Sequence, residues 1–336
     1  MMPERRTRSH AQWFKSAALI CVVGASSVPG FAATTWKPEK PVEIIATNAP
    51  GGGSDRILRL MGNVLQERRE LISVPVNIVN KPGAGGAVAY AYINQHAGDA
   101  HFLVLGSKAI LSNNVLGRGP SYAEVTPIAH LFSEYISLTV KPDSPIRNGK
   151  ELMERAKKDP ASVSFGIATS LGGANHQAAA AAFRAAGLDV RKMRTVIFPS
   201  GGAATTAMLG GHVDVVPITA AFAASMAKQG QVRVIAVTAP ARMPGLLADV
   251  PTWREQGFDA VVTNWRVMFG PKGLKEPQVA YWEETLNRIV QSDEWKRELA
   301  ANAWNSDYLR SAETRKFLER ETTEMRAFLT ELGMVK

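Results

Sequence analysis

The stretch Ala49-Pro50-Gly51-Gly52-Gly53-Ser54-Asp55-Arg56 constrains the fold of this chain more than any other. It lies between a strand pattern over 40–46, which is apolar over 42–46, and an amphipathic pattern over 55–70, so it predicts a strand, a glycine turn and the start of a helix. Consecutive glycines let backbone N–H groups approach a bound group closely, and the first turn of a helix carries unpaired N–H donors and a partial positive charge. The turn therefore suits an anion.

A second turn of this kind, Asn80-Lys81-Pro82-Gly83-Ala84-Gly85-Gly86, lies between an apolar strand over 76–79 and an alanine-rich helix over 87–95. A third apolar strand over 102–106 ends at Ser107 and completes a βαβαβ pattern. This pattern predicts a mostly parallel sheet with helices on both faces. Ligands of such sheets bind at the carboxyl ends of the strands, where both glycine turns lie.

The second half of the chain repeats the alternation of strands and helices, with a long extended run between the halves. We therefore expect an α/β fold with two lobes, one formed by 33–135 and 240–336 and the other by 136–239. The expected hinge strands lie near 131–140 and 232–238, and two crossings leave a cleft between the lobes. The remaining expected elements are helices over 149–158, 176–186, 203–209, 220–229, 277–299 and 312–332, and strands over 162–167, 194–198, 212–217 and 264–270.

The N-terminus has the features of a cleavable export signal. A basic segment precedes the apolar run 17–28, and Gly30 and Ala32 are small residues at the −3 and −1 positions of a cleavage site. We expect residues 1–32 to be a signal peptide cut near Ala32, which places the mature protein in the bacterial periplasm. Because Cys21, the one cysteine, lies within the signal, the mature chain has none.

The charge of the chain argues against nucleic acid as a partner. The formal net charge is +9, and it falls to about +6 without the signal peptide, which holds four bases and one acid. The lysines and arginines are scattered among acidic residues, with no aromatic residues interleaved among them. Such a mild positive charge favours encounter with small anions instead.

Three other chemistries are disfavoured. Arg56 and Val88 stand where a dinucleotide-binding turn requires a small residue, and the chain has no Gly-Lys-Ser/Thr. A hydrolase that uses Ser54 or Ser170 is disfavoured by a missing base: no histidine lies near Ser54 in sequence, and Ser54 is expected to be a helix N-cap. The histidines show no metal-ligand spacing. No catalytic residue, metal or cofactor is therefore expected.

Several polar residues allow two interpretations. Asp55, in the first turn of a helix, either complements the helix dipole or orients the loop and meets a ligand group. His176 opens a helix after a glycine loop, so it either reaches a ligand or packs. Asp214 lies in an expected strand, where a structural role is favoured, and Trp265 either lines the cleft or belongs to the core.

Several motifs together resemble the solute receptors of tripartite tricarboxylate transporters, also called Bug receptors. The motifs occur in order along the mature chain and are Ala49–Asp55, Asn80–Gly86, Leu209–Asp214, Val234–Thr238 and Asp249–Thr252. The resemblance implies a two-lobed periplasmic binding protein of the type II Venus-flytrap class that is not an enzyme. It also implies a small carboxylate ligand, which is delivered to membrane permease subunits.

The resemblance further implies that backbone amides and ordered waters of the first two glycine turns hold a ligand carboxylate, and that two loops of the second lobe decide what lies at the far end. The expected ligand-binding residues are Ala49, Pro50, Gly51, Gly52, Gly53, Ser54, Asp55, Gly83, Ala84, Gly85, Gly86, Ser107, Thr169, Ser170, Asn175, His176, Gly201, Gly202, Ala203, Thr205 and Asp214.

The chain departs from the family pattern at two places. Thr47 and Asn48 stand where the family usually has proline and an aromatic residue, and Phe198-Pro199-Ser200 replaces a pattern that usually includes a lysine. The identity of the ligand, a dicarboxylate, a tricarboxylate, an aromatic acid or an acidic amino acid, stays open. We expect a monomer, and the alternative function is a ligand-sensing partner of a membrane signalling protein.

Overall fold

The computed structural model describes residues 36–335, and the expected signal peptide lies outside them. The first part of the described chain is a parallel α/β unit, which we call the β1 side. Strand β1 pairs in parallel with β2 and with β3, and Ile44 lies opposite both Ile78 and Leu103. Its elements are β1 (Val42–Ala46), α1 (Gly53–Glu67), β2 (Val76–Asn80), α2 (Ala87–Asn94), β3 (Phe102–Gly106) and α3 (Ala109–Val115).

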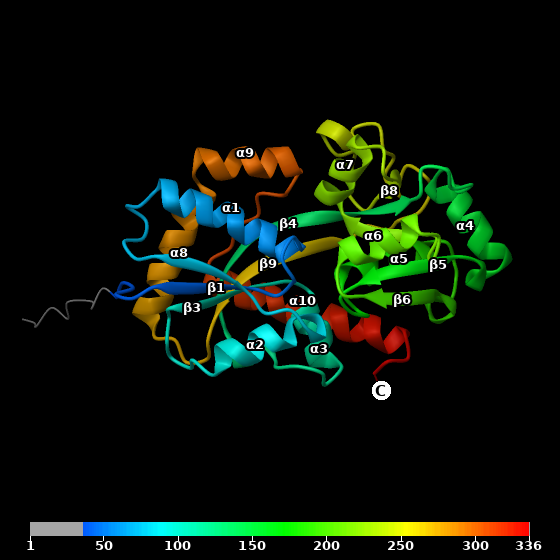
Figure 1. The fold of residues 1–336 in the computed structure, drawn as a ribbon. Coiled ribbons are helices and arrows are strands. Elements are labelled where there is room, and N and C mark those ends of the chain that lie inside the picture. The colour runs from blue at the N-terminus through cyan, green and yellow to red at the C-terminus, as the bar shows by residue number, and fades with distance from the viewer. Residues whose placement is uncertain (1–35, 336) are drawn as a thin grey trace, which may run out of the picture. The chain divides into compact units, whose positions relative to one another are not determined.

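The strand β4 (Thr126–Val140) is the longest strand and links two regions of the sheet. Its first part pairs antiparallel with β9 (Thr263–Gly270), which also pairs with β3. Its last residues, from Ile136 on, pair antiparallel with β7 (Val216–Thr219) and β8 (Arg233–Val237). The strand order of this seven-stranded sheet is β2-β1-β3-β9-β4-β7, with β8 also on β4 (Figure 1).

A second α/β unit, which we call the β5 side, lies between β4 and β8 in the sequence. Strands β5 and β6 form a separate two-stranded parallel sheet, and an isolated parallel bridge joins Phe165 of β5 to Val215. The elements of this unit are α4 (Gly149–Lys158), β5 (Ser164–Ala168), α5 (Ala174–Ala185), β6 (Arg194–Phe198), α6 (Gly201–Leu209), β7 and α7 (Ala220–Lys228).

Three helices close the chain, α8 (Glu276–Val290), α9 (Asp293–Asn302) and α10 (Ser311–Glu331). The expected single helix over 277–299 is wrong, because the chain turns at Ser292 and its side chain caps α9 by accepting from the Trp295 amide. Helices α8 and α9 bury Trp282 and Trp295 in the core that contains β1 and α1. Among residues 36–335, no helix is both long enough and apolar enough to cross a bilayer.

The α/β class expected from the sequence is confirmed, with differences in detail. The pairing is parallel where strands and helices alternate, but β4, β7, β8 and β9 pair antiparallel. The strand expected over 212–217 begins only at Val216, and α3 was not expected. The Gln256 side chain accepts from the Gly149 amide at 2.7 Å and donates to the Ile235 carbonyl at 3.1 Å, which ties the loop after β8 to α4 and β8.

Candidate functional site

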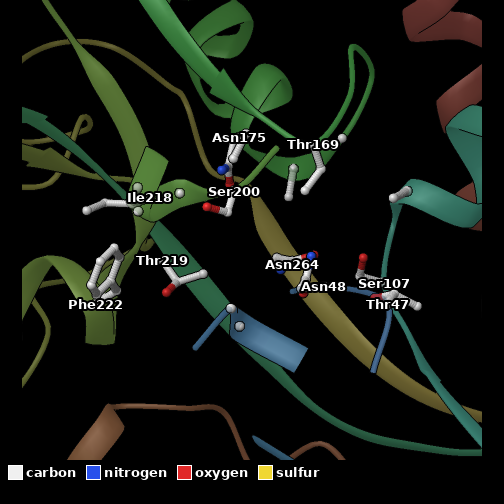
Figure 2. A pocket seen from close by; sticks show the side chains of 18 of the residues that line it. Thr47, Asn48, Ser107, Thr169, Asn175, Ser200, Ile218, Thr219, Phe222 and Asn264 are labelled. Atoms are coloured by element: carbon white, nitrogen blue, oxygen red, sulfur yellow. The ribbon is translucent and has the colours of Figure 1, made fainter. Parts of the chain in front are cut away.

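A cavity of about 250 Å³ lies where the β1 side faces the β5 side (Figure 2). Its size is below the usual range for sites that hold drug-sized molecules, so it suits a small ligand. The residues that line it are Thr47, Asn48, Ala49, Pro50, Gly51, Gly52, Gly53, Arg56, Gly85, Ser107, Ala109, Ala168, Thr169, Gly173, Ala174, Asn175, Ser200, Gly201, Gly202, Ile218, Thr219, Phe222, Asn264 and Arg266.

The first glycine turn is held by Asn48. The Ser54 amide and hydroxyl both donate to Asn48 Oδ1, at 3.1 and 2.7 Å. Asn80 donates in turn to the Asn48 carbonyl at 2.9 Å. The prediction that Ser54 is the N-cap is wrong: α1 begins at Gly53 with Gly52 as its N-cap, and Asn48 satisfies an amide of the first turn from four residues before that cap. The Asn48 side chain thereby fixes the start of α1 at the cavity.

Asp55 is buried beside the same turn and does not line the cavity. Its carboxylate accepts from the Gly51 amide at 2.8 Å, from Asn80 Nδ2 at 2.9 Å and from Arg59. Burial by itself would raise the pKa of Asp55, but the hydrogen bonds from Arg59, Gly51 and Asn80 outweigh it and lower the pKa below its ordinary value. These contacts support the interpretation that Asp55 orients the loop.

The second glycine turn has an unusual backbone. Gly83, Ala84, Gly85 and Gly86 all have positive φ, with Gly85 at +61°. Asn113 Nδ2 stabilises this path by donating to the carbonyls of Ala84 and Gly85, at 2.9 and 3.1 Å. Gly85 is the residue of this turn that lines the cavity, and a Cβ built on it would lie 3.0 Å from Asn113 Nδ2 and 3.3 Å from the Ser170 Cβ. A side chain at this position would therefore be strained and crowded.

Two helices of the β5 side point their N-termini at the cavity. Helix α5 begins after Gly173, and the preceding loop contains Thr169 at φ +68°, a conformation that is strained for a β-branched residue. Helix α6 is capped by the Ser200 hydroxyl, which accepts from the Ala203 amide at 3.1 Å. Together with α1, three helix N-termini converge on one cavity, and each contributes unpaired N–H groups and a partial positive charge.

Two arginines in the cavity wall were missed by the sequence reasoning. Arg266 of β9 is buried and donates to the buried Glu134 of β4, which also accepts from Asn264 Nδ2 at 3.0 Å. Arg56 of α1 lies over the ring of Phe222 in α7, with the guanidinium carbon 4.8 Å from the ring centroid. Arg56 stays exposed to solvent, and partial desolvation in the cleft lowers its pKa. The charge of Glu134 acts to raise this pKa, and the charge of Arg266 acts to lower it. Sequence reasoning could have identified Arg56 as a ligand-binding candidate from its position in the first turn of α1, directly after the glycine turn.

Of the residues predicted to bind the ligand, Ala49, Pro50, Gly51, Gly52, Gly53, Gly85, Ser107, Thr169, Asn175, Gly201 and Gly202 line the cavity. The structure places the others outside the lining. These are Ser54, Asp55, Gly83, Ala84, Gly86, Ser170, His176, Ala203, Thr205 and Asp214.

Most of the polar side chains among these outlying residues have other partners, although the buried Ser170 hydroxyl has no hydrogen-bond partner among residues 36–335. His176 is buried, accepts from the Gly172 amide at 3.0 Å and packs against Phe328. Asp214 accepts from the Ser164 amide and hydroxyl, at 2.8 and 2.6 Å, and the Thr205 hydroxyl donates to the Gly201 carbonyl. Trp265 is likewise a core residue, and its indole donates to Glu321. Their contacts are structural.

The chemistry of the wall is that of an anion-binding site. Backbone amides, hydroxyls and amide side chains surround the cavity, and the two charged side chains that line it are both arginines. Within the part of the chain that the structure describes, no group of three or more histidine, cysteine or acidic side chains could hold a metal ion. The arrangement can bind and orient an acid.

The fold and this cleft define a periplasmic binding protein. The chain is similar in structure to the periplasmic binding protein BugD, with a TM-score of 0.79, 23% identity and coverage of 89% of this chain and 99% of BugD. Residues 60–334 match the Tripartite tricarboxylate transporter family receptor, TctC, and the chain belongs to this family. The expectations of a Bug-type receptor and of a protein that is not an enzyme are thereby confirmed.

Two further solved structures are similar. MatC (Rpa3494) from Rhodopseudomonas palustris, with bound malate, has a TM-score of 0.76 and 22% identity, and the match covers 86% of this chain and 99% of MatC. Rpa4515 of R. palustris, with adipate, has a TM-score of 0.80 and 20% identity, and the match covers 88% of this chain and 98% of Rpa4515. At this identity they show the shared fold.

Proposed function

We propose that this protein is a periplasmic receptor that captures a small carboxylate in the cavity and delivers it to the permease subunits of a tripartite tricarboxylate transporter. The observation that carries the proposal is the convergence of the N-termini of α1, α5 and α6 on a cavity whose charged lining residues are arginines. Each amide that donates to a carboxylate contributes roughly 1.5–3 kcal/mol, and each helix terminus adds about 0.3–1 kcal/mol.

The relatives support the ligand class. The similar structure MatC holds malate and Rpa4515 holds adipate, and both ligands are dicarboxylates. The family supports the partner, since its receptors belong to a tripartite transporter. Export of this chain through a signal peptide cut near Ala32 remains part of the proposal.

A thermal-shift screen of the mature protein against small acids, followed by calorimetric titration, tests the proposal. An acid at 100 times its dissociation constant is expected to add about 2.7 kcal/mol to the free energy of unfolding, which raises the Tm by several degrees. The proposal fails if no acid raises the Tm while a neutral or cationic compound does.

The variant Gly85→Ala tests whether the second glycine turn forms the site. The added Cβ would meet Asn113 and Ser170 at a backbone with φ +61°, so we expect the stabilisation by acids to disappear. The matched control is Gly187→Ala, which imposes the same kind of strain at φ +76° with no atom within 4 Å of the new Cβ. The control is expected to lose about 1–2 kcal/mol of stability and to bind acids normally.

A further inference from the structure

We propose that Arg56 determines which acid is selected: with Phe222 it forms a lateral subsite for a second acidic group of the ligand. This inference rests on the proposed function, namely that an acid binds in the cavity. Arg56 and Phe222 both line the cavity, and they come from opposite walls, α1 on the β1 side and α7 on the β5 side.

The charge balance of the cavity leaves Arg56 as its uncompensated cation. Arg266 is neutralised by Glu134, and the Glu134 oxygen that accepts from Arg266 also accepts from Asn264. No carboxylate within residues 36–335 forms an ion pair with Arg56, and its side chain makes no hydrogen bond to these residues. The guanidinium groups of Arg56 and Arg266 carry two positive charges and the Glu134 carboxylate carries one negative charge, so one positive charge is left at the cavity.

The position of Arg56 over Phe222 suits it to a second acidic group. Attraction between a cation and a ring face is effective within about 6 Å of the ring centroid, and the separation here is 4.8 Å. A guanidinium carries its five N–H donors in one plane, and a planar fork of donors matches the two oxygens of a carboxylate. Because the ring holds the guanidinium in place, less side-chain freedom is lost when a ligand binds.

The same surroundings disfavour an acidic amino acid. A free carboxylate would bind its ammonium group most strongly, but Asp55 is buried and occupied by Arg59, Asn80 and the Gly51 amide. Glu134 is occupied by Arg266 and Asn264. The geometry therefore favours a ligand with two acidic groups and no amine.

The simplest competing explanation is that Arg56 only holds the two walls together. In that case its loss would weaken every ligand by the same factor, whatever the ligand charge. A subsite for an acidic group makes a different prediction, because its loss would affect only ligands that carry the second charge. Pairs of ligands that differ by one charge at nearly the same size distinguish the two explanations.

The experiment measures the dissociation constants of succinate and of its monoamide, succinamate, and of adipate and its monoamide, adipamate, by calorimetric titration. The variants are Arg56→Gln, which removes the charge, and Arg56→Lys, which keeps it. The matched control is Arg69→Gln, because Arg69 is exposed, has no ion pair among residues 36–335 and lies just beyond the end of α1.

Wild-type protein is expected to prefer at least one diacid over its monoamide, and Arg56→Gln is expected to reduce that preference by about tenfold or more. Arg56→Lys should retain part of the preference and Arg69→Gln all of it. The inference is overturned if the wild-type protein binds each diacid no more tightly than its monoamide. It is also overturned if Arg56→Gln leaves the ratio of the two dissociation constants unchanged, either because it weakens diacid and monoamide equally or because it weakens neither. If no acid binds wild type, the proposed function itself fails.

Discussion

At the scale of single residues, several polar side chains that pointed to a ligand instead stabilise the loops around the cavity. The Asp55 carboxylate accepts from the Gly51 amide, from Arg59 and from Asn80. His176 accepts from the Gly172 amide, next to the cavity-lining loop that precedes α5. A buried polar group must find a partner, so side chains next to a glycine loop are used to hold its backbone. The residue types indicated loops that line the cavity, but not the direction of each side chain.

His176 gives a prediction about pH. Burial lowers its pKa from the ordinary 6.5 to about 4, so the folded protein keeps the ring neutral. Below pH 6.5 the unfolded chain takes up a proton that the folded chain does not, and stability is lost as the pH falls from 6.5 to 4. The loss from this group is expected to reach about 3 kcal/mol, and above pH 6.5 the group adds no pH dependence.

The variant His176→Asn is expected to remove that loss, because asparagine can still accept from the Gly172 amide and does not titrate. Urea unfolding of both proteins between pH 7 and 4 measures it. Asp99 and Asp189 do not interfere, since their pKa values of about 2 place their contributions below about pH 4. Equal pH dependence in the two proteins would show that His176 is not the group responsible.

At the scale of elements, the site depends on where helices begin. Helices α1, α5 and α6 each begin within a loop that lines the cavity, and polar side chains fix two of these starts, Asn48 for α1 and Ser200 for α6. Local patterns located these helices within a few residues because glycine turns and capping residues are short-range signals. The break between α8 and α9 was missed, although Ser292 at that point is a typical capping residue.

The Asn48→Ala variant tests the start of α1. Loss of the acceptor for the Ser54 amide and hydroxyl is expected to cost about 1 kcal/mol of stability and also to weaken acid binding, because the loop lines the cavity. The control is Asn148→Ala, which removes a cap from α4 by deleting the acceptor of the Glu151 amide at 2.8 Å. It should cost a similar amount of stability and leave binding intact. If both variants bind acids equally well, the Asn48 contact does not shape the site.

At the scale of the whole described chain, helix α10 connects the two sides of the cavity from outside it. Glu321 accepts from the Trp265 indole at 2.8 Å and pairs with the buried Lys108, at the start of α3, at 2.9 Å. Further along the helix, Glu331 pairs with Arg184 of α5 at 2.9 Å. One helix thus contacts the β1 side through a buried ion pair and the β5 side through an exposed one.

These two ion pairs are expected to differ in energy. Glu321→Gln leaves the Lys108 ammonium buried without its countercharge and is expected to cost about 3 kcal/mol or more. Glu331→Gln, the matched control on the same helix, removes an exposed pair and is expected to change stability by less than about 1 kcal/mol. Urea unfolding at pH 7 measures both. Similar losses in the two variants would contradict the difference in burial.

The sequence by itself determined the α/β class, the positions of most helices and strands, and the glycine turns that surround the cavity. These follow from short-range rules, namely hydrophobic periodicity, glycine conformation and helix capping, together with ordered motifs that resemble one family. Only the tertiary structure showed that Arg266 meets Glu134, 132 positions away, and that Arg56 lies over Phe222. Such pairs depend on which strands become neighbours, on their register and on how the two walls face each other, and no local pattern encodes these.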